Sequence, residues 1–276
     1  ADTTWKEIYS PFLIYQTFEV PSGYTLTIEP GVTVKFIAGT NAIIRVYGTI
    51  NAIGTLSDTI SFTSSSITPS PGDYNYVNLK TNVNAHFEYC SFKYGSNAIY
   101  LSSLSNAWSI LVRHVSVDST SSHGIYYTQS SPDTSIELLI DSSVFRGNGS
   151  NYGIYWKDNT CCGKNFPKTR FVNNSFSGWE YAFMFSAYEN TRYNIKSIEN
   201  NIISDCNNGI YIGRSIVQNI TRPIIRGNTI TVDVNGIYTG SSIGNLVIDS
   251  NTITGSGSSG TGIYVTGPLD TIQFNT

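Results

Sequence analysis

Apolar positions along this chain are spaced by a short motif, in which a small residue precedes an inward-type aliphatic residue and a tyrosine. The motif occurs seven times, and its central residues lie 26 to 29 positions apart. The central residues are Ile99, Ile125, Ile154, Phe183, Ile210, Ile237 and Ile263. A fixed period of this length is typical of solenoids, in which each coil buries its apolar face on its neighbours. The spacing therefore predicts one buried column made of these seven side chains.

Two further periodic positions precede each copy of the motif. The first is apolar and is held by Phe87, Val112, Ile140, Phe171, Ile198, Ile225 and Ile248. The second is held by Cys90, Val115, Ser143, Asn174, Asn201, Asn228 and Asn251. Residues alternate between apolar and polar around these positions, which predicts three short strands in each coil. We expect the four asparagines to face inward at a turn and to bond neighbouring turns through their amides, because buried amides need partners.

This pattern resembles the right-handed parallel β-helix superfamily, which holds pectate lyases, polygalacturonases and many secreted surface proteins. The run from Val20 to Phe36, with its turn at Pro30-Gly31, is similar to the opening coils of non-catalytic cell-surface β-helix proteins of bacteria and archaea. The segments 48–54 and 60–62 continue that similarity. The resemblance covers residues 20–276 and implies an all-β solenoid of about ten coils. It implies little about activity, because one fold hosts many functions.

The periodic pattern continues without a linker, which predicts one β-helix domain over residues 1–276. Residues 1–22 fall outside the coil period but are apolar, so we expect them to form an N-terminal cap, with coils over 23–276. Residues 269–276 repeat the start of a coil. An uncovered last coil exposes unpaired backbone groups. We therefore expect a longer β-helix, a covering partner, or end-to-end filament assembly in which another copy's cap sits there.

Composition narrows the classes of protein that remain. Charged residues make up only 13% of the 276 residues, and the net charge is −3. No basic patch of the kind that nucleic acid requires is present, and no apolar run is long enough to span a membrane. The abundance of small polar residues and tyrosine favours an extracellular or cell-surface location. Glycosylation sequons at Asn148, Asn173 and Asn219 agree with that location.

The four cysteines divide into two groups. Cys90 occupies an inward position, which predicts a buried free thiol. Cys161, Cys162 and Cys206 allow one disulfide if the compartment is oxidising, and the sequence leaves the pairing open. Their spacing fits no zinc motif, so no metal site and no cofactor is predicted.

The sequence predicts no catalytic residue. The resemblance implies that an enzyme of this superfamily would carry clustered charges on an outer face, but the segment 222–226 lacks one residue of the lyase pattern, and His123-Gly124 is half of a hydrolase element. An enzyme would have to rely on loop residues such as Lys157, Asp158, Lys164 and Lys168. Hydrolysis of glycosides needs two carboxylates within about 5 to 10 Å of each other.

Six of the charged residues instead fall into one column with alternating signs. Its members are Glu88, Arg113, Asp141, Val172, Glu199, Arg226 and Asp249. Strands of neighbouring coils lie about 4.8 Å apart, so these residues are expected to form ion pairs between coils. We interpret the column as a structural feature that fixes the register.

The residue after each inward residue should point outward, and in six coils it is tyrosine. This column consists of Tyr100, Tyr126, Tyr155, Tyr211, Tyr238 and Tyr264, with Met184 in one coil. Aromatic rings stack on sugars and anchor protein interfaces, although tyrosine also simply suits exposed strands. The leading hypothesis is a secreted or cell-surface structural or adhesive protein, whose aromatic face binds glycans or other copies of the protein. The alternative hypothesis is a carbohydrate-active enzyme, either a polysaccharide lyase or a glycoside hydrolase.

Overall fold

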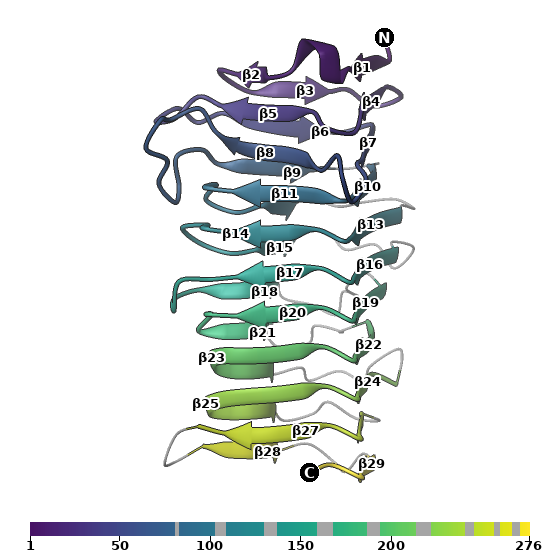
Figure 1. Cartoon of the computed structure of the whole chain (residues 1–276). Helices are drawn as coiled ribbons and strands as arrows, with labels where there is room; N and C mark the ends of the chain where they lie inside the picture. The colour runs from purple at the N-terminus through teal and green to yellow at the C-terminus, as the bar shows by residue number, and fades with distance from the viewer. Residues whose placement is uncertain are drawn as a thin grey trace.

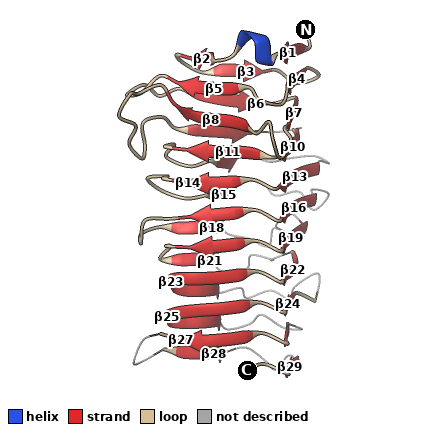
Figure 2. Cartoon of the chain, in the orientation of Figure 1, coloured by secondary structure: helices blue, strands red, loops and turns tan. Residues whose placement is uncertain are grey.

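The chain winds from its N-terminus to its C-terminus as one stack of coils, so that the two termini lie at opposite ends (Figure 1). Strands dominate the structure, and one short 3-10 helix, η1 (Glu7–Tyr9), lies near the N-terminus (Figure 2). The computed structural model describes residues 1–80, 83–102, 109–129, 137–158, 168–186, 194–213, 222–240, 246–256, 260–266 and 271–276.

Each coil contributes one strand to each of three parallel ladders, named here in the order in which the chain visits them. The first ladder is an eleven-stranded sheet. It consists of β1 (Thr3–Trp5), β4 (Thr25–Ile28), β7 (Thr49–Ile53), β10 (Asn84–Glu88), β13 (Ser109–Arg113), β16 (Glu137–Asp141), β19 (Lys168–Val172), β22 (Ile195–Glu199), β24 (Ile224–Arg226), β26 (Val247–Asp249) and β29 (Thr271–Gln273).

The second and third ladders form one 18-stranded sheet, because β23 (Ile202–Ile212) and β25 (Thr229–Thr239) run through both. The second ladder also holds β2 (Phe12–Ile14), β5 (Thr33–Phe36), β8 (Ile60–Ser64), β11 (Cys90–Lys93), β14 (Ser116–Asp118), β17 (Val144–Arg146), β20 (Ser175–Ser177) and β27 (Thr252–Gly255). The third also holds β3 (Phe18–Val20), β6 (Ile43–Val46), β9 (Tyr76–Leu79), β12 (Ile99–Ser102), β15 (Ile125–Gln129), β18 (Tyr152–Asp158), β21 (Tyr181–Ser186) and β28 (Thr261–Val265).

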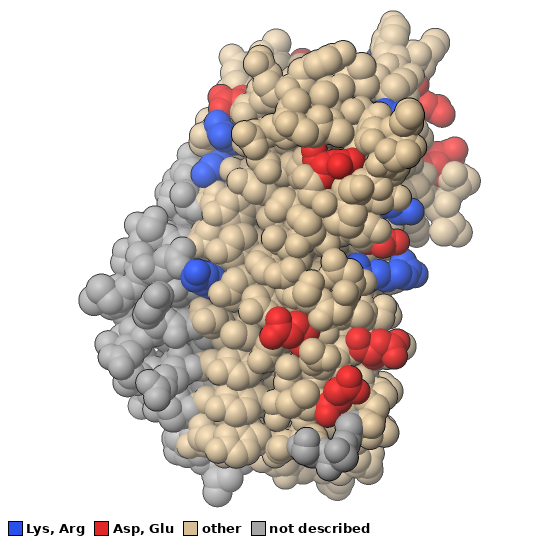
Figure 3. All heavy atoms as spheres, turned by 90° about the vertical axis from the view of Figure 1, so that its left-hand side faces the viewer, with Lys and Arg blue, Asp and Glu red and all other residues tan. Residues whose placement is uncertain are grey.

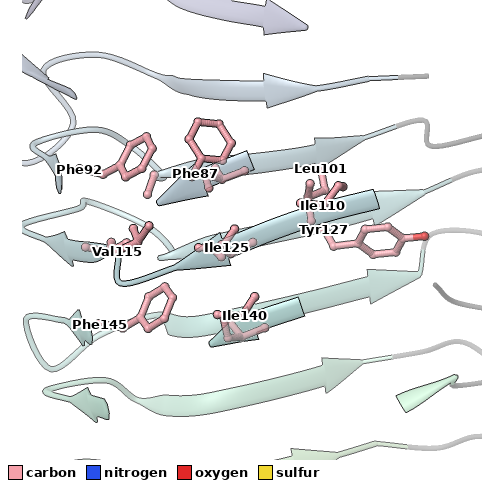
Figure 4. Packing of buried hydrophobic residues seen from close by; sticks show 14 of the residues in the cluster. Phe87, Phe92, Leu101, Ile110, Val115, Ile125, Tyr127, Ile140 and Phe145 are labelled. Carbon is pink, nitrogen blue, oxygen red and sulfur yellow. The ribbon is translucent and has the colours of Figure 1, made fainter. Parts of the chain in front are cut away.

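The predicted parallel β-helix is confirmed by this pairing. The predicted inward column stands in register through β12, β15, β18, β21, β23, β25 and β28. Its first six members are fully buried, while Ile263 is partly buried. Aromatic residues of the second ladder also stack inside, with Phe62 and Phe92 at 4.5 Å and Phe145 and Phe176 at 4.8 Å between ring centroids. Figure 4 shows part of this core, which holds the three ladders together.

The predicted asparagine stack is also confirmed. Asn174, Asn201, Asn228 and Asn251 are buried at the turn between the first and second ladders. Each side-chain amide donates to the Oδ1 atom of the next asparagine at 2.8 to 3.0 Å, and the series continues to Asn275. Each amide also donates to a backbone carbonyl of the preceding coil. The buried hydrogen-bonding groups at this turn are therefore satisfied because the same residue type recurs in successive coils.

Residues 1–22 were expected to form a cap before the coils, but the strand pairing shows that the coils begin within this segment. Strands β1, β2 and β3 pair in parallel with β4, β5 and β6, so this segment is itself the first coil. Its Trp5 ring stacks on Phe12 at 4.8 Å and packs at a tilt on Phe18 at 5.0 Å, which closes the end of the core. Thr3 is in register with Leu26, a step of 23 residues, and the same step separates Ile225 from Ile248 near the other end of the stack.

None of the helices among the described residues is long and apolar enough to cross a membrane.

Candidate functional site

The tyrosine column lies on the outer surface of the third ladder. Its six members are Tyr100, Tyr126, Tyr155, Tyr211, Tyr238 and Tyr264, and backbone pairing places each beside its neighbour, with Met184 between Tyr155 and Tyr211. Tyr264 is 46% exposed, and the other five are half-buried. The structure therefore brings together all six residues that the sequence singled out.

The rings of the column stack on one another along the helix axis. Tyr126 lies between Tyr100 and Tyr155, at 5.1 and 5.2 Å between centroids and with nearly parallel planes. Tyr238 lies between Tyr211 and Tyr264 at 4.7 and 5.1 Å. The faces inside each stack are turned to neighbouring tyrosines. Sugar stacking on those faces, as the sequence suggested, is therefore obstructed, and the column offers its ring edges instead.

A second aromatic row flanks the column at its middle coils. His123, Tyr152 and Tyr181 form this row, and His123 stacks on Tyr152 at 5.1 Å. The two rows meet at nearly perpendicular angles, with Tyr152 against Tyr155 at 4.6 Å and Tyr181 against Tyr211 at 5.6 Å. We call the two rows together the aromatic face. The aromatic face is widest at the middle coils, where His123, Tyr152 and Tyr181 lie beside the tyrosine column.

Sequence reasoning missed the second row because strict alternation assigns it to the interior. Tyr152 lies two positions before the buried Ile154, yet it is partly exposed, and the glycine between them is buried. A Cβ atom at Gly153 would lie 2.7 Å from the Phe176 ring and 2.8 Å from a backbone oxygen of the next coil. A small residue here lets the backbone approach the core closely. The side chain of Tyr152 before it then turns outward, while that of Ile154 after it stays buried. The recurrent small residue of the motif was the signal that could have revealed the row.

Burial favours the uncharged form of several side chains of the aromatic face. Burial, with a smaller effect of neighbouring tyrosines, raises the pKa of Tyr100 to about 12. Burial likewise raises the pKa values of Tyr126, Tyr152 and Tyr181, so these hydroxyls stay protonated. Burial, assisted by the nearby Lys157, lowers the pKa of His123 to about 4 and keeps its imidazole uncharged. The face is suited to neutral ligands that form hydrogen bonds.

Of the four residues of the enzyme hypothesis, the two whose side chains the structure describes lie on different ladders. Lys157 lies in β18 on the third ladder, whereas Lys168 begins β19 on the first ladder and lies 3.8 Å from Glu137. The side chain of Asp158 and all of Lys164 lie outside the described residues. Within the described ranges, no group of three or more histidine, cysteine or acidic residues is arranged to hold a metal ion.

The alternating charge column stands in register as predicted, but it forms fewer ion pairs than expected. Arg113 donates to Asp141 at 3.2 Å, and Arg226 donates to Asp249 at 2.9 Å. Glu88 bonds the histidine two residues before it instead of the arginine of the next coil. The column contributes to the register, with each exposed pair adding at most about 1 kcal/mol.

Two of the three sequons can be located. Asn148 is exposed, and its Oδ1 atom accepts a hydrogen bond from the Ser150 hydroxyl at 2.8 Å. Asn173 is exposed at a turn with a φ of 58°, and its amide donates to Asp141 at 3.2 Å. Asn219 lies outside the described residues. Glycosylation at these positions stays a prediction.

Both cysteines in the described part are free and buried. Cys90 agrees with the sequence prediction. Cys206 is a free thiol, and Cys161 and Cys162 lie outside the described residues, so a disulfide among these three cysteines stays a prediction. Burial raises the pKa of Cys206 to about 12 and also raises that of Cys90, so neither thiol is a reactive thiolate at neutral pH.

Comparison with known proteins identifies no family for the chain. No family model matches it, and no curated protein matches it either. A solved structure that it resembles is the alginate lyase from Paenibacillus sp. str. FPU-7, at 13% sequence identity and a TM-score of 0.26. That similarity covers 92% of this chain and 99% of the lyase chain. A likeness this weak carries no argument about activity, and the β-helix rests on the strand pairing described above.

Proposed function

We propose that this protein is a secreted or cell-surface structural and adhesive β-helix, whose aromatic face binds glycan chains. The observation that supports this most is the column of six tyrosines in register on one ladder, widened by a second row. Charged side chains are few and scattered on the side of the molecule that Figure 3 shows. A rigid array needs no ordering when it binds, and such preorganisation favours affinity.

The geometry favours recognition through ring edges and hydroxyls. Successive rings lie 4.7 to 5.2 Å apart along each stack. An extended glycan lying along the helix axis would meet similar contacts at each coil of the two tyrosine stacks, which Met184 separates. Many weak contacts of this kind bind through multivalency rather than through one deep pocket.

A glycan array run beside a polysaccharide degradation screen tests the proposal. We expect retention of one or more neutral glycans without release of reducing ends or unsaturated products. Replacing Tyr211 and Tyr238 together by Ala should abolish retention while the circular dichroism spectrum keeps its β signature. The matched control is Tyr15→Ala, which removes an exposed tyrosine of the first coil outside the column.

Replacing Tyr211 and Tyr238 together by Phe distinguishes the mode of binding. This change keeps both rings and removes two hydroxyls, each of which contributes about 1 kcal/mol if it bonds the ligand. Retention about 30-fold weaker would agree with hydroxyl recognition. Unchanged binding by the Ala variant, with the fold intact, would remove the aromatic face from the function, and product release in the screen would favour the enzyme alternative. Binding of the protein to itself alone would instead favour contact between copies.

A further inference from the structure

A groove with a positive charge runs along the outer surface of the first ladder, away from the aromatic face. It consists of two adjoining hollows of about 300 and 430 Å³, which share Arg170 and Lys196 in their walls. Arg222 lines the second hollow, two residues before β24. These three cationic residues come from three successive coils, so they line up along the helix axis.

The cations of the groove outnumber its acids by five to two, although the whole chain has a net charge of −3. Two of the cations are neutralised, because Arg113 bonds Asp141 and Lys168 lies near Glu137. Within the described part of the chain, the side chains of Arg170 and Lys196 form no ion pair or hydrogen bond, and the Arg222 side chain donates to the Thr271 hydroxyl at 2.9 Å. The groove therefore carries unpaired positive charge.

A local irregularity in the strand pairing places Lys196 beside Arg170. The pairing of β19 with β22 shifts between Thr169 and Arg170, so that Thr169 faces Ile195 and Arg170 faces Ser197. Lys196 is the extra residue of this bulge. Ile195 and Ser197 are buried on either side of it, and its own side chain stays partly exposed beside Arg170. Bulges commonly redirect a side chain in this way near functional sites.

The residues around Arg170 provide an apolar floor and no acid on its own strand. Leu139 and Leu111 stand in register above Arg170, both partly exposed and both lining the first hollow. Val172, two residues along from Arg170, is the one position of the alternating column that lacks a charge. An anion can therefore approach Arg170 without meeting a carboxylate on that strand.

We propose that this groove binds an oxyanion group, a carboxylate or a sulfate ester, carried by a sugar ring. The Arg170 guanidinium can hold two oxygens of such a group at once, and Lys196 adds a point charge beside it. Leu139 offers an apolar surface to the ring that bears the anion. Glu137 and Glu199 line the groove in the coils before and after that of Arg170. They interrupt the row of positive charge, which disfavours a long polyanion such as nucleic acid. The proposal is independent of the aromatic face.

Titration of the whole chain with D-glucuronate, N-acetylglucosamine 6-sulfate and inorganic sulfate tests the proposal. Binding should be measured by NMR or calorimetry at about 10 mM and about 150 mM NaCl, where the Debye length falls from about 30 Å to about 8 Å. We expect at least one of the two sugar probes to bind, and to bind more weakly at the higher salt concentration. The carboxylate and sulfate probes distinguish the two sources of the oxyanion, and binding of inorganic sulfate alone would overturn the sugar part of the proposal.

Three variants separate the groove from general electrostatics. Arg170→Gln combined with Lys196→Gln should weaken binding at least about tenfold. The control Lys93→Gln removes an exposed cation of the second ladder and should leave binding unchanged. Glu199→Gln should strengthen binding, because it removes an acid from the groove wall. Wild-type protein that binds neither sugar probe, or a double variant that binds as wild type does, would overturn the proposal.

Discussion

The asparagine stack and the tyrosine column are built by the same repetition of coils but lie in opposite environments. Inside, each asparagine donates to its copy in the next coil and leaves no amide unbonded. Outside, each tyrosine covers the ring face of its copy and keeps an edge for solvent. Parallel register places like beside like, so a repeated residue must be one that interacts well with itself.

The difference lies in what a defect would cost. A missing asparagine leaves buried polar groups unpaired, and each of these costs about 1 to 3 kcal/mol. A missing tyrosine removes contact area that solvent can partly replace. The interior stack is therefore expected to govern stability, and the exterior column is free to serve binding.

The largest effect is expected for Asn201→Ala. Four hydrogen bonds at 2.9 to 3.0 Å are lost, and the Phe171 carbonyl and the Asn174 backbone N–H are left buried without partners. We expect the free energy of unfolding to fall by about 3 to 5 kcal/mol, measured by urea denaturation. The control Asn148→Ala changes an exposed turn and should cost well under 1 kcal/mol. Equal midpoints for the two variants would contradict the contrast.

The next effect concerns the small residue that turns the second aromatic row outward. Gly153→Ala places a methyl group 2.7 Å from the Phe176 ring, so the strand or that ring must shift. We expect a loss of about 1 to 3 kcal/mol in the free energy of unfolding. The matched control is Gly149→Ser, at an exposed turn position where a Cβ atom meets nothing within 4 Å, although its φ of 88° adds some strain. A cost at Gly153 no larger than at Gly149 would show that close packing does not set this bend.

The aromatic face should depend on pH, whereas the asparagine stack should not. The folded-state pKa of His123 is lowered from 6.5 to about 4, so the fold favours the neutral ring. The resulting stability is fully present above about pH 6.5 and is lost as the pH falls toward 4, amounting to at most about 2 kcal/mol by pH 5.

The variant His123→Asn isolates this titration from that of the carboxylates. Asn208 and Asn235 hold the same column position in later coils, so the substitution fits the repeat. Urea midpoints at pH 7 and pH 5 should fall less for the variant than for the wild-type protein. Parallel losses in the two proteins would show that His123 does not titrate as described.

The smallest effect is expected within the tyrosine column itself. Tyr238 stacks on two neighbours, whereas Tyr264 stacks on Tyr238 alone among the described residues. Each aromatic pair adds about 0.5 to 1.5 kcal/mol, so Tyr238→Ala should destabilise the protein more than Tyr264→Ala does. Thermal melts of both variants measure the difference. A larger loss for Tyr264 would mean that stacking contributes little at this face.

The interior could be predicted from the sequence to a large extent. The Ile column and the asparagine stack were both assigned from spacing alone, because a shift of one residue would turn every buried side chain to the outside. The same spacing assigned the tyrosines to one outer column. Because a buried position accepts few residue types, a periodic apolar pattern is enough to identify the side chains that face the core.

What the sequence by itself determined is which residues stand in line: the parallel β-helix, its three ladders and its repeated columns. Only the tertiary structure determined how the side chains of these columns are oriented and which of them contact one another. It turned the tyrosine faces toward one another, moved His123 and Tyr152 outward beside a buried small residue, made residues 1–22 a full coil and set Lys196 beside Arg170 through a bulge. The physical reason is that the period fixes register, whereas ring orientation, bulges and outer-face charge depend on contacts between coils that alternation along one strand does not encode.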